Sequence, residues 1–82
     1  MTGHIKGGNK AHQREKIYAI LREIDDWVGV YKIGQVCWKS EDETIKNIKP
    51  PTIRRCLQEL RDNNPPLAKY DPVRSEWYGV PQ

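Results

Sequence analysis

Apolar residues recur at helical spacing in three separate stretches of this chain. In the first stretch they follow the i, i+3, i+4, i+7 spacing that places side chains on one face of a helix. The residues concerned are Ile17, Ile20, Leu21 and Ile24. This spacing predicts a first helix over residues 11–25, and Gly29 is predicted to mark the break in structure after this helix.

The next two elements are predicted to be short. A β-branched and aromatic run over residues 28–31 favours a very short strand. A second helix is predicted over residues 32–39, although Gly34 lowers its helix propensity. The apolar side chains predicted to point inward from this helix are Ile33, Val36 and Cys37.

The third helix has the clearest boundaries. Pro50 and Pro51 suit a first helical turn, where the missing backbone N–H leaves no helical hydrogen bond unmade. The Asn-Asn-Pro-Pro run over residues 63–66 ends the helix. Its buried stripe consists of Ile53, Cys56, Leu57 and Leu60. At about 100° per residue, the side chains that point most directly away are Arg55, Gln58 and Asp62, with Arg54 and Arg61 flanking them on one side.

A polar, acidic connection and a hairpin complete the pattern. Residues 40–49 are predicted to be anchored by Ile45 and Ile48, with room for an extra helical turn. Strands are predicted over residues 67–70 and 76–80, with a turn over 71–75. Alternation assigns Leu67, Tyr78 and Val80 to the core and leaves Lys69 and Arg74 exposed, while Trp77 either packs under the hairpin or is free to stack on a ligand.

The length of the chain, 82 residues, is sufficient for one domain with a thin core. No apolar run approaches the roughly 20 residues needed to cross a bilayer, so no membrane partner is expected. Residues 1–10 contain three glycines and no hydrophobic centre, so they are predicted to be a flexible tail rather than a secretory signal. Residues 11–82 are predicted to form the domain.

The sequence lacks the residue patterns of an enzyme or a metal site. Cys37 and Cys56 lie on apolar stripes, which favours buried free thiols and leaves a disulfide open. Because the two cysteines lack the paired spacing of zinc ligands, no metal or other cofactor is expected. There is no nucleophile–base pair and no Gly-rich phosphate loop, so neither enzymatic activity nor a small-molecule substrate is expected. The acidic run 41–43 is interpreted as a solvated loop or a contact for a basic partner.

The formal net charge of +3 is unevenly distributed along the chain. Basic residues prevail over residues 1–24 and 46–61, whereas acidic residues prevail over 25–45. Such clustering favours a polyanionic partner over an ordinary mixed-charge surface.

The element order and one stretch of the third helix resemble the winged helix-turn-helix superfamily. In residues 52–60 a hydroxyl residue, an aliphatic residue and an Arg-Arg pair precede Leu-x-x-Leu, as in the third helix of many such regulators. Residues 67 and 76–80 are similar to their wing. The resemblance covers residues 11–80 and implies an α+β, mainly α, winged-helix fold with three helices and a C-terminal β-hairpin wing.

This resemblance implies double-stranded DNA as the partner, with the third helix in the major groove. Arg55 would donate two hydrogen bonds to guanine, Gln58 would pair with adenine, and Thr52 would contact a phosphate or a base. The phosphate contacts would come from Arg54, Lys46 and Lys49 and, on the wing, from Lys69 and Arg74. The expected role is sequence-specific binding in transcription regulation, or a phage or plasmid accessory function. The expected cellular compartment is the cytoplasm at the nucleoid, or the nucleus in a eukaryote.

Two features depart from the common pattern and keep other functions open. The connection over residues 40–49 is long and acidic, and the wing turn carries a single basic residue, Arg74. Both favour the alternative of a protein-interaction module within a larger nucleic-acid-processing assembly. A third alternative is single-stranded nucleic acid bound through Trp77 and Tyr70. Whether the protein forms a homodimer or joins a larger assembly is left open.

Overall fold

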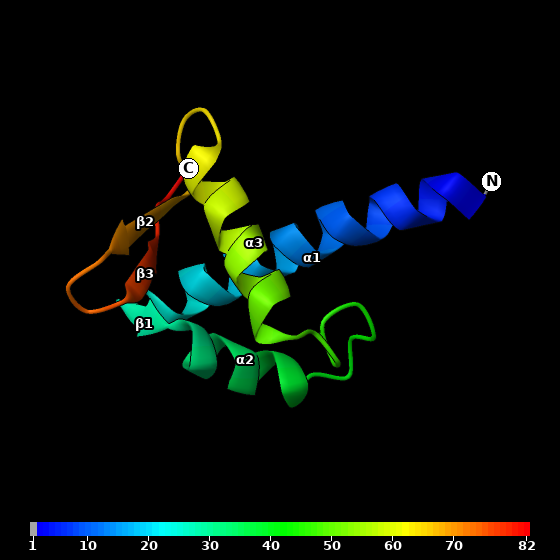
Figure 1. Cartoon of the computed structure of the whole chain (residues 1–82), viewed down its shortest axis with the longest axis horizontal. Helices are drawn as coiled ribbons and strands as arrows, with labels where there is room; N and C mark the ends of the chain where they lie inside the picture. The colour runs from blue at the N-terminus through cyan, green and yellow to red at the C-terminus, as the bar shows by residue number, and fades with distance from the viewer. Residues whose placement is uncertain (1) are drawn as a thin grey trace.

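The computed structural model describes residues 2–82, with side chains from Ala11 onward, and confirms an α+β, mainly helical fold (Figure 1). Within these residues the chain forms three α-helices and one three-stranded antiparallel sheet. In chain order the elements are α1 (Thr2–Ile24), β1 (Val28–Gly29), α2 (Val30–Trp38), α3 (Pro50–Asp62), β2 (Ala68–Asp71) and β3 (Glu76–Gly79). Strands β2 and β3 form the C-terminal hairpin that the sequence predicted.

Helix α1 begins at Thr2, well before the predicted start at Ala11. The apolar stripe that predicted the helix starts only at Ile17, so the pattern does not report how far the helix runs toward the N-terminus. Residues 1–10 were predicted to be a flexible tail. Their side chains lie outside the described part of the chain, so this flexibility stays a prediction. At its other end α1 stops at Ile24, and Asp25 takes the left-handed φ of 50° that commonly follows a helix.

One buried cluster joins the three helices to the sheet. Helix α3 contributes the whole stripe that its spacing predicted, α1 contributes its stripe with Ile24 only partly buried, and the connection between α2 and α3 is anchored by Ile45 and Ile48 as expected. Val36 was predicted to point inward but is exposed, because the buried face of α2 centres on Ile33, Gly34 and Cys37. The core consists of Ile17, Ile20, Leu21, Val28, Ile33, Cys37, Ile45, Ile48, Ile53, Cys56, Leu57, Leu60, Ala68 and Trp77.

The hairpin buries the face opposite to the predicted one. Trp77 is only 4% exposed, whereas Tyr78 is partly exposed and its hydroxyl donates a hydrogen bond to Asp25 Oδ1 at 3.1 Å. Strand β3 is central in the sheet order β1-β3-β2, and Trp77 pairs with residues of both neighbouring strands. The side chains of β3 alternate as predicted, but the buried residues are Trp77 and Gly79. Because Gly79 has no side chain, this face looked less apolar in the sequence than the face with Tyr78 and Val80. Leu67 and Val80, also predicted as core, are partly buried.

Both cysteines are free and buried, which confirms the prediction. Burial and, to a smaller extent, the neighbouring Cys56 raise the pKa of the Cys37 thiol to about 11. Burial also raises the pKa of Cys56. Both thiols therefore remain protonated at neutral pH and act as small apolar core side chains.

Gly79 marks the place where β3 approaches α1 most closely. A Cβ atom at this position would lie 2.8 Å from Leu21 Cβ and 3.2 Å from the Leu21 carbonyl carbon. Since neither atom can move without shifting α1, Gly79→Ala is expected to lower the free energy of unfolding by about 1–3 kcal/mol. Each kcal/mol corresponds to a fall in Tm of about 4–8 °C for a domain of this size, which thermal unfolding followed by circular dichroism will measure.

Gly29 supplies the matched control for this substitution. A Cβ at Gly29 would meet its nearest atom, the Ser75 carbonyl oxygen, at 4.0 Å. Gly29→Ala is therefore expected to change the free energy of unfolding by about 0.5 kcal/mol or less. Equal losses in the two variants would contradict the close approach of β3 to α1.

Candidate nucleic-acid interface

A groove lies between α3 and the hairpin, and we call it the α3–hairpin groove. Helix α3 contributes Arg54, Gln58 and Arg61, which the i, i+4, i+7 spacing places on one helix face. The other lining residues are Gly29 from β1, Val30 and Tyr31 from the start of α2, and Tyr70, Ser75 and Trp77 from the hairpin. The groove has a volume of about 440 Å³, and none of its lining residues is a carboxylate. Its lining therefore combines cationic, amide and aromatic groups.

Aromatic rings form the hairpin side of this groove. The Tyr70 and Trp77 ring centroids lie 4.6 Å apart at an interplanar angle of 40°. The Arg61 guanidinium carbon lies 5.9 Å from the Trp77 ring centroid, within the range of a cation–π contact. Because Trp77 is buried beneath these two side chains, Tyr70 and Tyr31 carry the exposed ring surface of the groove. This placement leaves little of Trp77 available for base stacking.

The predicted contact residues on α3 divide between two faces. Arg54 and Gln58 line the groove, and Arg54 forms no ion pair among the side chains described from residue 11 onward. Arg55 is not among the lining residues, and its Nε lies 4.0 Å from Glu59 Oε2. Arg61 was predicted only to flank the outward face, yet it is a groove residue. Its i+7 spacing from Arg54 was the sequence signal that could have identified it.

A second hollow lies at the N-terminal end of α3. It is lined by residues 46–50 together with Trp38 and has a volume of about 580 Å³. The Trp38 Nε1–H donates a hydrogen bond of 2.6 Å to the Ile48 carbonyl oxygen, which ties the connection to α2. Lys46 and Lys49, two of the predicted phosphate contacts, both line this hollow and are exposed beside the first turn of α3. Thr52 lies within that turn and is partly buried.

The two predicted hairpin contacts lie away from the groove lining. Lys69 pairs with Tyr78 in the β2–β3 register, so it lies on the sheet face opposite to Trp77. Arg74 lies in the turn, where its Nε is 3.8 Å from Asp71 Oδ2. The structure therefore does not bring Lys69 together with the α3 arginines, and it partly neutralises Arg74.

The basic residues of α1 are matched by acidic partners. Arg14 Nη1 lies 3.0 Å from Glu59 Oε1, and Lys16 Nζ lies 3.2 Å from Asp42 Oδ2. Arg22 Nη1 lies 3.6 Å from Asp25 Oδ1 and also donates a hydrogen bond to the Gly79 carbonyl oxygen. Over residues 11–24, the basic side chains of the first helix are thus paired within the fold, although the sequence had grouped their charge with that of α3.

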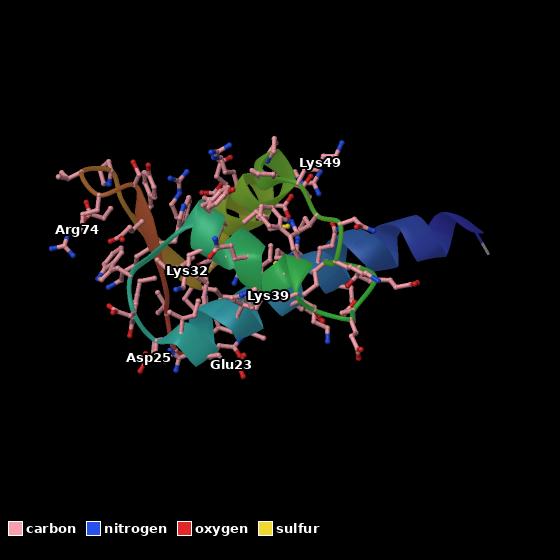
Figure 2. The ribbon with its side chains drawn as sticks, turned by 90° about the horizontal axis from the view of Figure 1, so that it is seen from below. Glu23, Asp25, Lys32, Lys39, Lys49 and Arg74 are labelled. Atoms are coloured by element: carbon pink, nitrogen blue, oxygen red, sulfur yellow. The ribbon has the colours of Figure 1, made fainter. Side chains whose placement is uncertain are left out.

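Two lysines, Lys32 within α2 and Lys39 directly after it, add basic residues beyond the predicted ones. Figure 2 shows Lys32 and Lys39 between Arg74 at one end of the view and Lys49 at the other, with Asp25 at the α1 edge. Both lysines are exposed, and among the described side chains neither forms an ion pair. Sequence reasoning missed them because the acidic residues around them in the chain mask their charge.

Asp42 links the connection between α2 and α3 to α1 through an ion pair with Lys16. Its Oδ1 accepts hydrogen bonds from the backbone N–H of Thr44, at 2.9 Å, and from the Thr44 hydroxyl. Its Oδ2 faces Lys16 and lies 3.8 Å from His12 Nε2. The Thr44 hydrogen bonds, followed by Lys16, lower the pKa of the Asp42 carboxyl from 3.8 to about 2. The middle residue of the predicted acidic loop is therefore a structural contact rather than a purely solvated one.

This lowered pKa predicts a pH-dependent contribution to stability. Because the folded chain favours the carboxylate, the contribution of Asp42 is fully present above pH 3.8 and is lost as pH falls toward 2. The Tm of Asp42→Asn should therefore be lower than that of the wild type at neutral pH, and this difference in Tm should vanish near pH 2. The exposed neighbour provides a control, since Glu43→Gln should leave Tm unchanged across this window. A pH-independent difference for Asp42→Asn would contradict the role of the carboxylate.

Comparisons of the chain with protein-family models, with curated proteins and with solved structures gave no match. Across the described residues, none of the helices combines the length and apolar character needed to cross a membrane.

Proposed function

We propose that this chain is a winged-helix-type binding module, not an enzyme, that binds double-stranded DNA through α3 and the hairpin. The observation that carries the proposal is the row of Arg54, Gln58 and Arg61 along a groove without a carboxylate. Cationic and amide side chains on one exposed helix face suit contacts with phosphates and base edges. The compartment follows from the proposed partner: the cytoplasm at the nucleoid, or the nucleus in a eukaryote.

The proposed contacts differ among the basic residues. Arg54 and the two lysines before α3 hold phosphates, and Gln58 pairs with adenine in the major groove. Arg55 reads guanine only if it exchanges Glu59 for the base, because the two side chains form an ion pair in the free protein. Base reading by Gln58 is therefore favoured over base reading by Arg55. Thr52 and Arg74 remain proposed contacts outside the groove lining, and so does Lys69 on the other face of the sheet.

A binding titration tests the proposal directly. Fluorescence anisotropy with a mixed-sequence duplex of about two helical turns, ~20 bp, is expected to show saturable binding at low salt. If about four phosphates are neutralised, log affinity should fall with log salt at a slope of about −3.6. Absence of binding at low salt, with the protein folded by circular dichroism, would overturn the proposal.

An exposed aromatic pair on α2 favours a second candidate function, that of a protein-interaction module. The Tyr31 side chain is 68% exposed, and its ring centroid lies 5.8 Å from that of Trp38 in an edge-on arrangement. Exposed aromatic rings are common in protein–protein interfaces. Chemical-shift mapping separates the two functions. Duplex DNA should perturb residues 52–58 and 69–74, whereas a partner protein on the aromatic pair should perturb Tyr31 and residues 38–45 and leave residues 52–58 unperturbed.

A further inference from the structure

The α3–hairpin groove contains more chemistry than a phosphate contact uses. A phosphate needs only cations or N–H donors, and Arg54 and Arg61 already supply them. The groove adds two exposed tyrosine rings, Tyr31 and Tyr70, and the Gln58 side-chain amide. Its volume of about 440 Å³ falls in the range, about 300–1,000 Å³, of sites that hold small organic ligands. A ligand that matches every group must carry a negative charge, a flat ring and polar ring edges.

We propose that this groove receives one unpaired nucleotide, with its base against Tyr70 and its phosphate at the arginines. This inference rests on the proposed function where the nucleotide belongs to a bound DNA strand. The same groove chemistry would also accept a free mononucleotide, and the experiment below separates these two sources.

The arrangement around Tyr70 fits it for stacking. The Tyr70 ring contacts the Trp77 ring at a centroid distance of 4.6 Å, and Tyr70 is 37% exposed. A ring held from behind loses little conformational freedom when a base stacks on its other side. Trp77 therefore acts through Tyr70, as a positioning residue that is itself too buried to touch a base.

The polar groups divide between the two ends of a nucleotide. Gln58 carries an amide that can donate to and accept from the edge of an unpaired adenine at once, and in that complex it does not also read a paired adenine. Arg54 is free of ion pairs among the described side chains, so it meets a phosphate without first releasing a carboxylate. The Arg61 guanidinium carbon lies 5.9 Å from the Trp77 ring centroid, and its Nε lies 3.6 Å from Asp62 Oδ1, so a phosphate at Arg61 competes with that carboxylate.

Three duplexes of about 20 bp test the inference by fluorescence anisotropy. One is fully paired, one carries a single unpaired adenosine, and one carries an abasic nucleotide at the same point. The adenosine duplex is expected to bind about tenfold more tightly than the other two, the order expected for one base stacked on an aromatic ring. The abasic duplex separates recognition of the base from recognition of a bent or flexible backbone.

Variants of the hairpin assign the preference to the groove. Tyr70→Ala should abolish the preference for the adenosine duplex, and Tyr70→Leu, which keeps an apolar contact with Trp77, should do the same in a folded protein. Val73→Ala is the matched control, because this side chain lies in the same hairpin and is 92% exposed. It should retain the preference. A preference that survives in folded Tyr70→Leu would overturn the inference.

The remaining outcomes distinguish this inference from the proposed function. Equal binding of all three duplexes would overturn the groove assignment while leaving duplex binding intact. If no duplex binds, the proposed function fails, and a titration with dAMP then decides the groove. Perturbed resonances of Tyr70 and of the Gln58 amide would support a free-nucleotide site, and unperturbed resonances would overturn it.

Discussion

Trp77→Ala is expected to lower the free energy of unfolding by about 3–5 kcal/mol, the loss typical of a large aromatic residue removed from a core. Trp77 is 4% exposed and lies on the central strand, where it pairs with Val28 and Tyr70. For 82 residues, total stability is of the order of 4–12 kcal/mol. The variant should therefore be marginally folded at room temperature, and urea unfolding followed by circular dichroism will measure the loss.

Val73→Ala is the control for this prediction as well. The Val73 side chain is in the hairpin turn and almost fully exposed, so its loss should change stability by about 0.5 kcal/mol or less. A Trp77→Ala variant as stable as Val73→Ala would place the indole outside the core and reopen single-strand binding through Trp77.

The helices and their buried stripes were predictable because each depends on a local pattern. Pro50 and the Asn-Pro run after Asp62 fix α3 through backbone chemistry alone, and the stripe from Ile53 to Leu60 repeats at helical spacing. The buried face of the hairpin was not predictable in the same way. Its choice depends on β1 pairing with β3 and on the contact of Gly79 with Leu21, and both are long-range.

The candidate interface was predictable only in part, and for a similar reason. Helical spacing placed Arg54, Arg55 and Gln58 on the outward side of α3. Which of them faces the hairpin depends on where residues 68–79 pack beside α3, and the hairpin lies beside Arg54 and Gln58 but not Arg55. Likewise, nothing local indicates that Arg61 packs over Trp77 or that Lys69 lies on the other face of the sheet.

Reversal of charge at Arg54 is expected to weaken duplex DNA binding by about 100-fold. Arg54→Glu removes a phosphate contact and places a carboxylate in a groove that has none, so lost attraction and new repulsion add. The slope of log affinity against log salt should become shallower by about 0.9, the value for one phosphate. Anisotropy titrations over a range of salt concentrations measure both quantities.

Lys16→Glu is the matched control, because it changes net charge by the same amount at a residue of α1. Lys16 is paired with Asp42, and neither residue is a proposed DNA contact or lines the α3–hairpin groove. Its variant should bind the duplex within about threefold of the wild type and keep the salt slope, since a long-range effect of net charge is screened beyond about 8–10 Å. Equal losses in both variants would mean that only overall charge drives binding. In that case the row of Arg54, Gln58 and Arg61 would not be the interface, and the acidic partner would be held by a diffuse basic surface.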